Sequence, residues 1–323
     1  MKSYGRRGRS PTAMGAVVMV VVLLAGCGDA SQTTREDTAS LQAGAEDARV
    51  SGAGGPDAAE GPDAAEGPVH PDFDMTMTEL ESQLRSAAAK LRPEFGDTYA
   101  PAVLNRPEYF LELMKQSFSE DPDFFRLVDK NHALPADYEP EDLVDLNRYR
   151  DRLVLNRGDL RLRAAVLPDL FAMIEAARPA GITLDLSSTY RSYDYQAGLF
   201  RRHVDNLGEE EAERVSARPG TSQHQLGTTV DFGSITPEFA DTQAGRWLAE
   251  HAGEFGFSLS YPDGYEPLTG YSYEPWHFRY TSRVGTEMEA QFFGGLQQHF
   301  LEFYRLNGEW FRSRLSGETG ETE

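Results

Sequence analysis

Four side chains, those of His224, Asp231, Glu274 and His277, have the types and spacing needed for hydrolytic chemistry. The first two lie in the segment SQHQLGTTVD and the other two in the segment EPWH. Two imidazoles and one carboxylate are a sufficient ligand set for a catalytic zinc ion, with the fourth position left for water. Glu274 precedes a proposed ligand by three residues, where it can act as general base for that water. The alternative is chance proximity, because the chain holds seven histidines among 52 Asp and Glu residues.

The local sequence around these residues indicates how they converge. A turn at Gly227 followed by a short strand would bring His224 and Asp231 to one metal ion. An ideal strand points residues i and i+3 to opposite faces, which would separate Glu274 from His277. Pro275 keeps Glu274 extended and outside the hydrogen-bonded ladder. We therefore predict a local bend that brings Glu274 near the metal while His277 binds it.

Arg191 is the candidate cation of the site. A fixed guanidinium can hold a carboxylate with two hydrogen bonds or stabilise an oxyanion. Ser192, Tyr193 and Gln196 surround it in the sequence with further hydrogen-bonding groups. The alternative is an arginine at the start of a helix in a structural salt bridge. His203, His251 and His299 lie on expected helices without paired acids at ligand spacing, and we interpret them as surface or core residues. For His132 the alternatives are a residue at the edge of the site and a loop residue with a hydrogen bond, and we favour the second.

Apolar spacing predicts the elements that position these side chains. A helical stripe over 162–177 ends near Gly181, and the alternating segment 182–188 predicts a strand that delivers Arg191 to the start of the next helix. Further expected elements are a helix over 242–255, strands over 257–261 and 271–280, and a short strand followed by a proline-containing loop over 124–146. Outside this region, order is expected from Met75, with two packing helices before residue 121 and one aromatic helix over 287–310.

The first 27 residues have the pattern of an export signal. Four basic residues precede an apolar run, 16–24, that is short for a membrane span. The run ends in Leu-Ala-Gly-Cys, which resembles the lipobox of lipoproteins and makes Cys27 the candidate for lipidation. Cys27 is the only cysteine, so the chain forms no internal disulfide. The alternative is an ordinary cleaved signal peptide with an incidental cysteine.

Residues 28–72 have the composition of a disordered tether. They contain almost no large apolar side chains, and the unit GPDAAE occurs twice in succession at 55–66. Such a segment cannot bury enough apolar surface to offset the entropy of ordering. Its expected role is to hold a domain away from a membrane. The net charge of −21 excludes nucleic acid as a partner, because binding to phosphate needs a basic surface.

Three motifs resemble the signature of the VanY-type D-alanyl-D-alanine carboxypeptidases. They are YRSYDYQ at 190–196, RPGTSQHQLG at 218–227 followed by Asp231, and EPWH at 274–277. The segment 127–144 is similar to the family's entry motif, and the whole resemblance covers about residues 122–282. The departure is Thr228-Thr229, where the family usually has an apolar and a small residue. This departure alters packing near the metal and removes no ligand.

The resemblance implies a small α+β zinc peptidase that acts on peptidoglycan stem peptides. It implies that His224, Asp231 and His277 are zinc ligands and that Glu274 is the base. Arg191, Gln196 and Ser222 would line the substrate site, with Ser192 and Tyr193 beside them.

The expected fold is thus a small antiparallel sheet with packed helices over 122–282. A helical extension at 73–121 precedes it, and a C-terminal helix and tail at 283–323 follow it. The expected protein is a monomeric D-Ala-D-Ala carboxypeptidase of the cell envelope, lipid-anchored on the periplasmic or outer-surface face. The alternatives are an L,D-carboxypeptidase or a peptidoglycan endopeptidase on the same scaffold, and a non-catalytic wall-binding lipoprotein.

Overall fold

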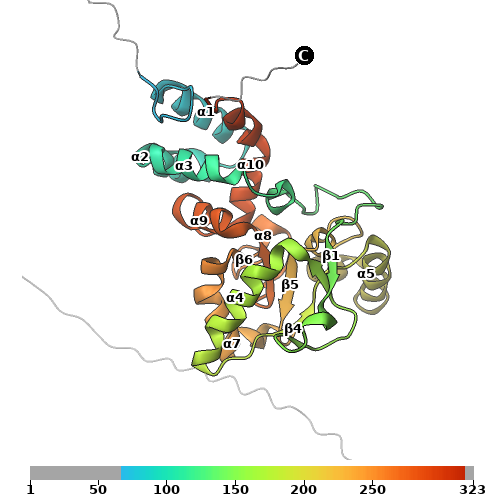
Figure 1. The fold of residues 1–323 in the computed structure, drawn as a ribbon. Coiled ribbons are helices and arrows are strands. Elements are labelled where there is room, and N and C mark those ends of the chain that lie inside the picture. The colour runs from blue at the N-terminus through green and yellow to red at the C-terminus, as the bar shows by residue number, and fades with distance from the viewer. Residues whose placement is uncertain (1–66, 317–323) are drawn as a thin grey trace, which may run out of the picture. The chain divides into compact units, whose positions relative to one another are not determined.

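The computed structural model describes residues 67–316, and Figure 1 shows their fold. The expected signal segment, Cys27 and the tether up to residue 66 lie outside the described residues. Among the helices that the structure describes, none has both the length and the apolar character needed to cross a bilayer. The packed part of the chain begins before Met75, since His70 is buried and Lys115 donates a 2.8 Å hydrogen bond to Asp72. The tether boundary expected at residue 72 is therefore too late.

A five-stranded sheet forms the centre of the fold, in the order β2-β4-β5-β7-β6. Its strands are β2 (Val154–Leu155), β4 (Asp185–Ser188), β5 (Thr229–Phe232), β7 (His277–Tyr280) and β6 (Phe257–Leu259). Every neighbouring pair is antiparallel except β2 and β4, which are parallel. The expected α+β class with a small antiparallel sheet is thus confirmed, with one parallel edge that the sequence does not reveal.

Two expected elements in the first half of the domain are different in the structure. The segment beginning at Phe124 forms a 3-10 turn (Pro122–Phe125) and then a tight turn, in which the Asp129 carboxylate accepts the backbone N–H groups of Asn131 and His132. The short strand expected there was wrong. The strand of this region is β1 (Leu143–Asp145), which pairs antiparallel with β3 (Arg161–Arg163).

That pairing also explains why the first long helix of the domain begins later than expected. Leu162 belongs to β3, opposite Val144, so the helix α4 covers only Leu167–Ala177. The helices that follow the sheet strands are α5 (Tyr193–Leu207), α6 (Glu209–Val215), α7 (Gln243–His251) and α8 (Glu266–Thr269). Ser192 begins α5 as its N-cap, because its side chain accepts a hydrogen bond from the backbone N–H of Tyr195.

The two segments outside the family resemblance pack together as one group of helices. These are α1 (Met77–Lys90), α2 (Ala100–Asn105) and α3 (Pro107–Ser117) from the N-terminal side, and α9 (Ser282–Phe292) and α10 (Gln297–Arg312) from the C-terminal side. Phe110 of α3 meets Phe292 of α9 and Phe303 of α10 edge to face. Figure 1 shows α10 beside α1 and α3. We call these five helices the terminal bundle.

The single aromatic helix expected over 287–310 is divided in the structure. Gly294 and Gly295 both adopt positive φ, of 66° and 72°, and end α9 before α10 begins. Only glycine adopts this conformation without strain, so the pair allows the chain to turn. Phe292 and Phe303 consequently meet in one core from two different helices.

Glu289 of α9 is a buried acid that gives the fold a pH dependence. Its Oε1 accepts a 2.9 Å hydrogen bond from the Thr281 hydroxyl, and burial raises the pKa of Glu289 to about 7. The folded protein keeps this carboxyl protonated up to about pH 7, whereas the unfolded chain ionises it near its ordinary pKa. The stability that it contributes is therefore complete at acidic pH and is lost as the pH rises through 7.

We expect Glu289→Gln to weaken this pH dependence in metal-free protein. The wild type should lose up to roughly 3 kcal/mol more unfolding free energy than the variant between pH 4.5 and 8. Urea unfolding at both pH values measures this difference. Glu287→Gln, on the same helix at the surface, is the control. Equal pH dependence in the wild type and Glu289→Gln would contradict the assignment.

Candidate metal centre and active site

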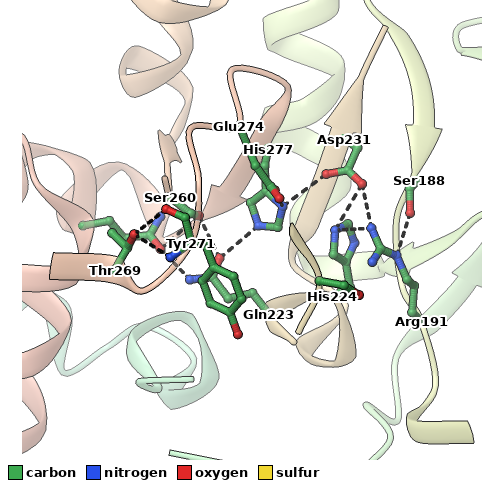
Figure 2. A network of polar contacts seen from close by, with 12 residues as sticks. Ser188, Arg191, Gln223, His224, Asp231, Ser260, Thr269, Tyr271, Glu274 and His277 are labelled. Atoms are coloured by element: carbon green, nitrogen blue, oxygen red, sulfur yellow. Dashed lines mark hydrogen bonds and ion pairs between the residues drawn. The ribbon is translucent and has the colours of Figure 1, made fainter. Parts of the chain in front are cut away.

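Three buried side chains converge at the centre of the sheet. His224 comes from the 3-10 turn Gln223–Leu226, Asp231 from β5 and His277 from β7. Asp231 and His277 are direct partners in the antiparallel register, which places their side chains on one face. One ligand atom from each of the three lies within 4.8 Å of the others, close enough to hold one metal ion. Figure 2 shows the Asp231 carboxylate between the two imidazoles.

Hydrogen bonds on the far sides of the rings decide which nitrogen faces the group. His224 Nδ1 lies 2.6 Å from the carbonyl oxygen of Thr189, which can only accept, so Nδ1 carries the proton and Nε2 carries the lone pair that faces the group. His277 Nε2 lies 3.2 Å from Gln223 Oε1, which leaves Nδ1 directed at Asp231. Such contacts behind a histidine ligand fix its tautomer and its orientation.

The electrostatics of the group favour a cation. Burial and the neighbouring Arg191 lower the pKa of His224 to about 4, so this ring is neutral, as a metal ligand must be. Burial alone would raise the pKa of Asp231, but His224, His277 and Arg191 outweigh it and hold the pKa well below its usual value. Burial alone would lower the pKa of His277, but the neighbouring carboxylates of Asp231 and Glu274 outweigh it and raise the pKa.

The donor set fits zinc. Asp231 Oδ1 lies 3.2 Å from His277 Nδ1 but is a buried oxygen without a hydrogen bond of acceptable geometry among the described residues. A carboxylate oxygen and an imidazole lone pair that face each other repel unless a proton or a metal ion attracts both. Two imidazole nitrogens and a carboxylate are ligands that zinc commonly takes in catalytic sites.

Glu274 lies beside this group because the chain bends as predicted. The backbone N–H of His277 donates to the carbonyl of Glu274 at 3.1 Å, and only 277–280 of the expected strand 271–280 pairs in the sheet. The backbone N–H of Glu274 is bound to the carbonyl of Tyr261 at 3.1 Å. Glu274 Oε2 consequently lies 3.3 Å from His277 Nδ1. The remainder of that expected strand is loop.

Arg191 lies on the opposite side of Asp231. Its Nη2 donates to Asp231 Oδ2 at 2.7 Å and lies 2.8 Å from His224 Nε2. Its other nitrogens donate to Ser188 Oγ at 2.9 Å and to Gln196 Oε1 at 3.2 Å, which fix the plane of the guanidinium. Gln196 is itself held by the carbonyl of Ala217. The chain thus builds a rigid cation next to the ligand group.

A cavity of about 210 Å³ opens over the group. Ser222 lines it, as do Arg191 and Glu274. Of the other substrate residues expected from the sequence, Gln196 is buried behind Arg191, Ser192 caps α5, and neither Ser192 nor Tyr193 is among the described residues of this cavity wall. Their expected substrate contacts therefore stay a prediction.

Sequence reasoning missed several residues of the cavity wall. These are Leu199, His203, Val215, Ser216, Ala217, Ile235, Tyr261, Tyr271 and Trp276. His203 had been interpreted as an ordinary surface or core histidine. A signal was present, because Gln196, Leu199 and His203 follow at helical spacing on one face of α5. His132, His251 and His299 instead pair with Asp129, Glu254 and Tyr99, away from the site.

The fold and the site together define the class: a small α+β hydrolase with a buried group that can hold a divalent metal ion. The family model VanY, D-alanyl-D-alanine carboxypeptidase, matches residues 159–283. The D-alanyl-D-alanine carboxypeptidase of Enterococcus faecalis (strain ATCC 700802 / V583) is 31% identical over 198 residues, which are 58% of this chain and 69% of that protein. This chain belongs to the VanY family of D-alanyl-D-alanine carboxypeptidases.

The solved structures to which the chain is similar include the following two carboxypeptidases. The LD-carboxypeptidase LdcB is 31% identical, with a TM-score of 0.51, and the match covers 57% of this chain and 88% of that chain. The vancomycin-resistance D,D-pentapeptidase VanY from a VanB-type cassette, solved as a variant with Zn(II), is 30% identical, with a TM-score of 0.47, over 55% of this chain and 99% of that chain. The buried His-Asp-His group of this chain is a ligand set that fits the expected zinc cofactor.

The proposed ligands and the proposed base can be distinguished by the effect of their substitution on zinc affinity. We expect His224→Ala, Asp231→Ala and His277→Ala each to bind zinc at least about tenfold more weakly, because each loses a ligand atom. Glu274→Ala should retain one zinc ion per chain, because the three ligands remain. Titration with a competing chelator, followed by metal analysis, measures this, and His251→Ala serves as the control. Stoichiometric, tightly bound zinc in all four variants would refute the ligand set.

Proposed function

We propose that the chain is a zinc-dependent carboxypeptidase that removes the C-terminal D-alanine from peptidoglycan stem peptides. The observation that carries the proposal is the buried His224, Asp231 and His277 group, with Glu274 and Arg191 on its two sides at the wall of one cavity. A wall-binding protein without catalysis needs neither a base nor a fixed cation there. All of these residues come from one chain, which supports activity as a monomer.

The roles of the side chains follow from their positions. When bound, zinc supplies a Lewis acid for the scissile carbonyl and lowers the pKa of water at the site. Glu274, 3.3 Å from a proposed ligand nitrogen, takes the proton of the attacking water and passes it to the leaving amine. Asp231 stays ionised, and His224 stays neutral, so both are ready to bind a cation without losing a proton.

We assign Arg191 to the oxyanion and not to the terminal carboxylate. Its Nη2 lies within 2.8 Å of atoms of both His224 and Asp231, so the guanidinium is adjacent to the proposed zinc position. The scissile carbonyl must lie beside that position, whereas the terminal carboxylate is one residue farther along the substrate. The hydroxyls of Ser216 and Ser222 on the cavity wall are the donors that we assign to this carboxylate.

The test of the function is a product assay with peptides of defined length. Purified stem pentapeptide ending in D-Ala-D-Ala should release D-alanine in a reaction that chelator abolishes and zinc restores. Release of D-alanine only from the tetrapeptide would favour the L,D-carboxypeptidase alternative, for which the similarity to LdcB is the specific observation. Cleavage of C-terminally amidated and free peptides at equal rates would overturn exo-specificity and favour an endopeptidase.

For Arg191→Lys we expect kcat to fall about 100-fold, because an ammonium cannot reproduce a fixed planar donor at the oxyanion. KM should change less than about threefold if the oxyanion assignment holds. Steady-state kinetics on the pentapeptide measure both constants, and Arg283→Lys, a surface ion pair with Asp169, is the control. A large rise in KM with kcat retained would instead place the terminal carboxylate on Arg191.

For the location of the protein we propose a lipid anchor at Cys27, which holds the enzyme at the cell envelope. The support is the lipobox-like sequence that ends at Cys27 and the tether composition after it. The catalytic residues all lie beyond residue 190, so anchoring and catalysis are separable.

We expect Cys27→Ala to release active enzyme from the membrane fraction without changing turnover on soluble peptide. Fractionation followed by the D-alanine assay measures both properties, and Cys27→Ser provides a second variant without the thiol. Recovery of the variants in the membrane pellet in wild-type amounts would argue against the anchor.

A further inference from the structure

A chain of buried amides links the proposed ligand His277 to the terminal bundle. Behind His277, Gln223 Oε1 lies 3.2 Å from the ring Nε2 and accepts a 2.7 Å hydrogen bond from the Ser260 hydroxyl. Gln223 Nε2 donates to Gln297 Oε1 at 3.1 Å. Gln297 is the first residue of α10, and Gln223, Ser260 and Gln297 are all buried. Figure 2 shows Gln223 next to His277 on the side away from Asp231.

The direction of these hydrogen bonds is set at the far end of the chain. Gln297 Nε2 lies 2.6 Å from Ser258 Oγ and 3.4 Å from the carbonyl oxygen of Ser258, which can only accept. Gln297 must therefore present its amide nitrogen to Ser258 and its oxygen to Gln223.

The same matching of hydrogen-bond donors and acceptors sets the orientation of the Gln223 amide. With Gln297 Oε1 as acceptor, Gln223 must present its nitrogen to Gln297 and its oxygen to His277. Ser260 fills the second lone pair of that oxygen. A flipped Gln223 would place two carbonyl oxygens against each other in a buried site, where neither has a donor. The ring Nε2 of His277 is then the donor, and Nδ1 retains the lone pair that faces Asp231.

We infer that Gln297, acting through Gln223, is a positioning residue for the metal centre: it fixes His277 in the tautomer that can bind the metal ion through Nδ1. The inference rests on the proposed function only in that His277 is taken as a ligand. Gln297 lies beyond residues 159–283, the part that matches the family model. The terminal bundle is thereby part of the metal centre of this chain, although none of its helices supplies a ligand.

The first experiment compares two neighbouring glutamines of α10. Gln297→Met removes the acceptor of Gln223 and the bond to Ser258, and should weaken zinc binding about tenfold, within the usual range for a residue behind a ligand. Gln298→Met is the matched control, because Gln298 is also buried but bonds to Asp129 and Glu302. It should bind zinc as the wild type does. Competition with a chromophoric chelator measures affinity, and circular dichroism confirms that both variants fold.

The second experiment separates tautomer control from packing. Nitrogen-15 NMR of the metal-free protein, at a pH above the raised pKa of His277 so that the ring is neutral, reports which ring nitrogen carries the proton. His277→Ala assigns the signal. We expect the Nε2–H form in the wild type and in Gln223→Glu, which keeps an acceptor. We expect an increase of the Nδ1–H form in Gln297→Met and Gln223→Met. Gln223→Glu should also bind zinc at least tenfold more tightly than Gln223→Met.

Two outcomes would overturn the inference without affecting the proposed function. One is a zinc affinity of Gln297→Met within threefold of the wild type. The other is an unchanged His277 tautomer in Gln223→Met. If Gln297→Met does not fold, the two Gln223 variants and the NMR measurement decide alone. Failure of the proposed function has a different signature, because the wild type itself would then bind no zinc or release no D-alanine.

Discussion

The site depends on one constraint, the burial of the Asp231 carboxylate. A buried, ionised carboxylate costs several kcal/mol unless cationic or donor groups surround it. In this chain its neighbours are His224, His277 and Arg191, which come from three further segments of the sequence. A further hydrogen bond fixes each of these neighbours: the carbonyl of Thr189 binds His224, Gln223 binds His277, and Gln196 binds Arg191. The need to compensate the negative charge of Asp231 thus determines the positions of Asp231 and its three neighbours. The resulting arrangement favours a divalent cation.

The sheet satisfies this requirement through its register. Asp231 and His277 are opposite each other on β5 and β7, and Ser188, which holds Arg191, is opposite Asp231 on β4. A shift of either pairing by one residue would turn these side chains to the other face. The buried residues Val230 and Phe278, also paired across β5 and β7, face the core and oppose such a shift. Packing of the core on one face therefore maintains the chemistry on the other.

The convergence of the four candidate side chains could be predicted because its sequence signals are local. His224, Asp231, Glu274 and His277 lie in two short motifs, and the bend at Pro275 follows from the chemistry of proline. The boundary between β3 and α4 could not be predicted from the sequence. Leu162 continues a helical stripe, and only its pairing with Val144 makes it a strand residue. The packing of the N-terminal and C-terminal helices into one bundle could not be predicted either. An amphipathic stripe indicates that one face of a helix is buried, but it does not indicate which segment covers that face. The break at Gly294-Gly295 had a signal, but the aromatic stripe on both sides masked it.

The terminal bundle illustrates how a segment without ligands can still determine a site. Its aromatic core joins Phe110 to Phe292 and Phe303 and holds α9 and α10 together, and α9 contacts β6 of the sheet. This packing places the start of α10 within hydrogen-bonding distance of Gln223, which no sequence pattern could indicate, because Gln223 and Gln297 are far apart in the chain. A glutamine has no fixed polarity of its own, since its amide can be turned by half a rotation. Its orientation must come from a group that can only accept, and the carbonyl of Ser258 is such a group, so the polarity of the metal centre originates in the backbone of β6.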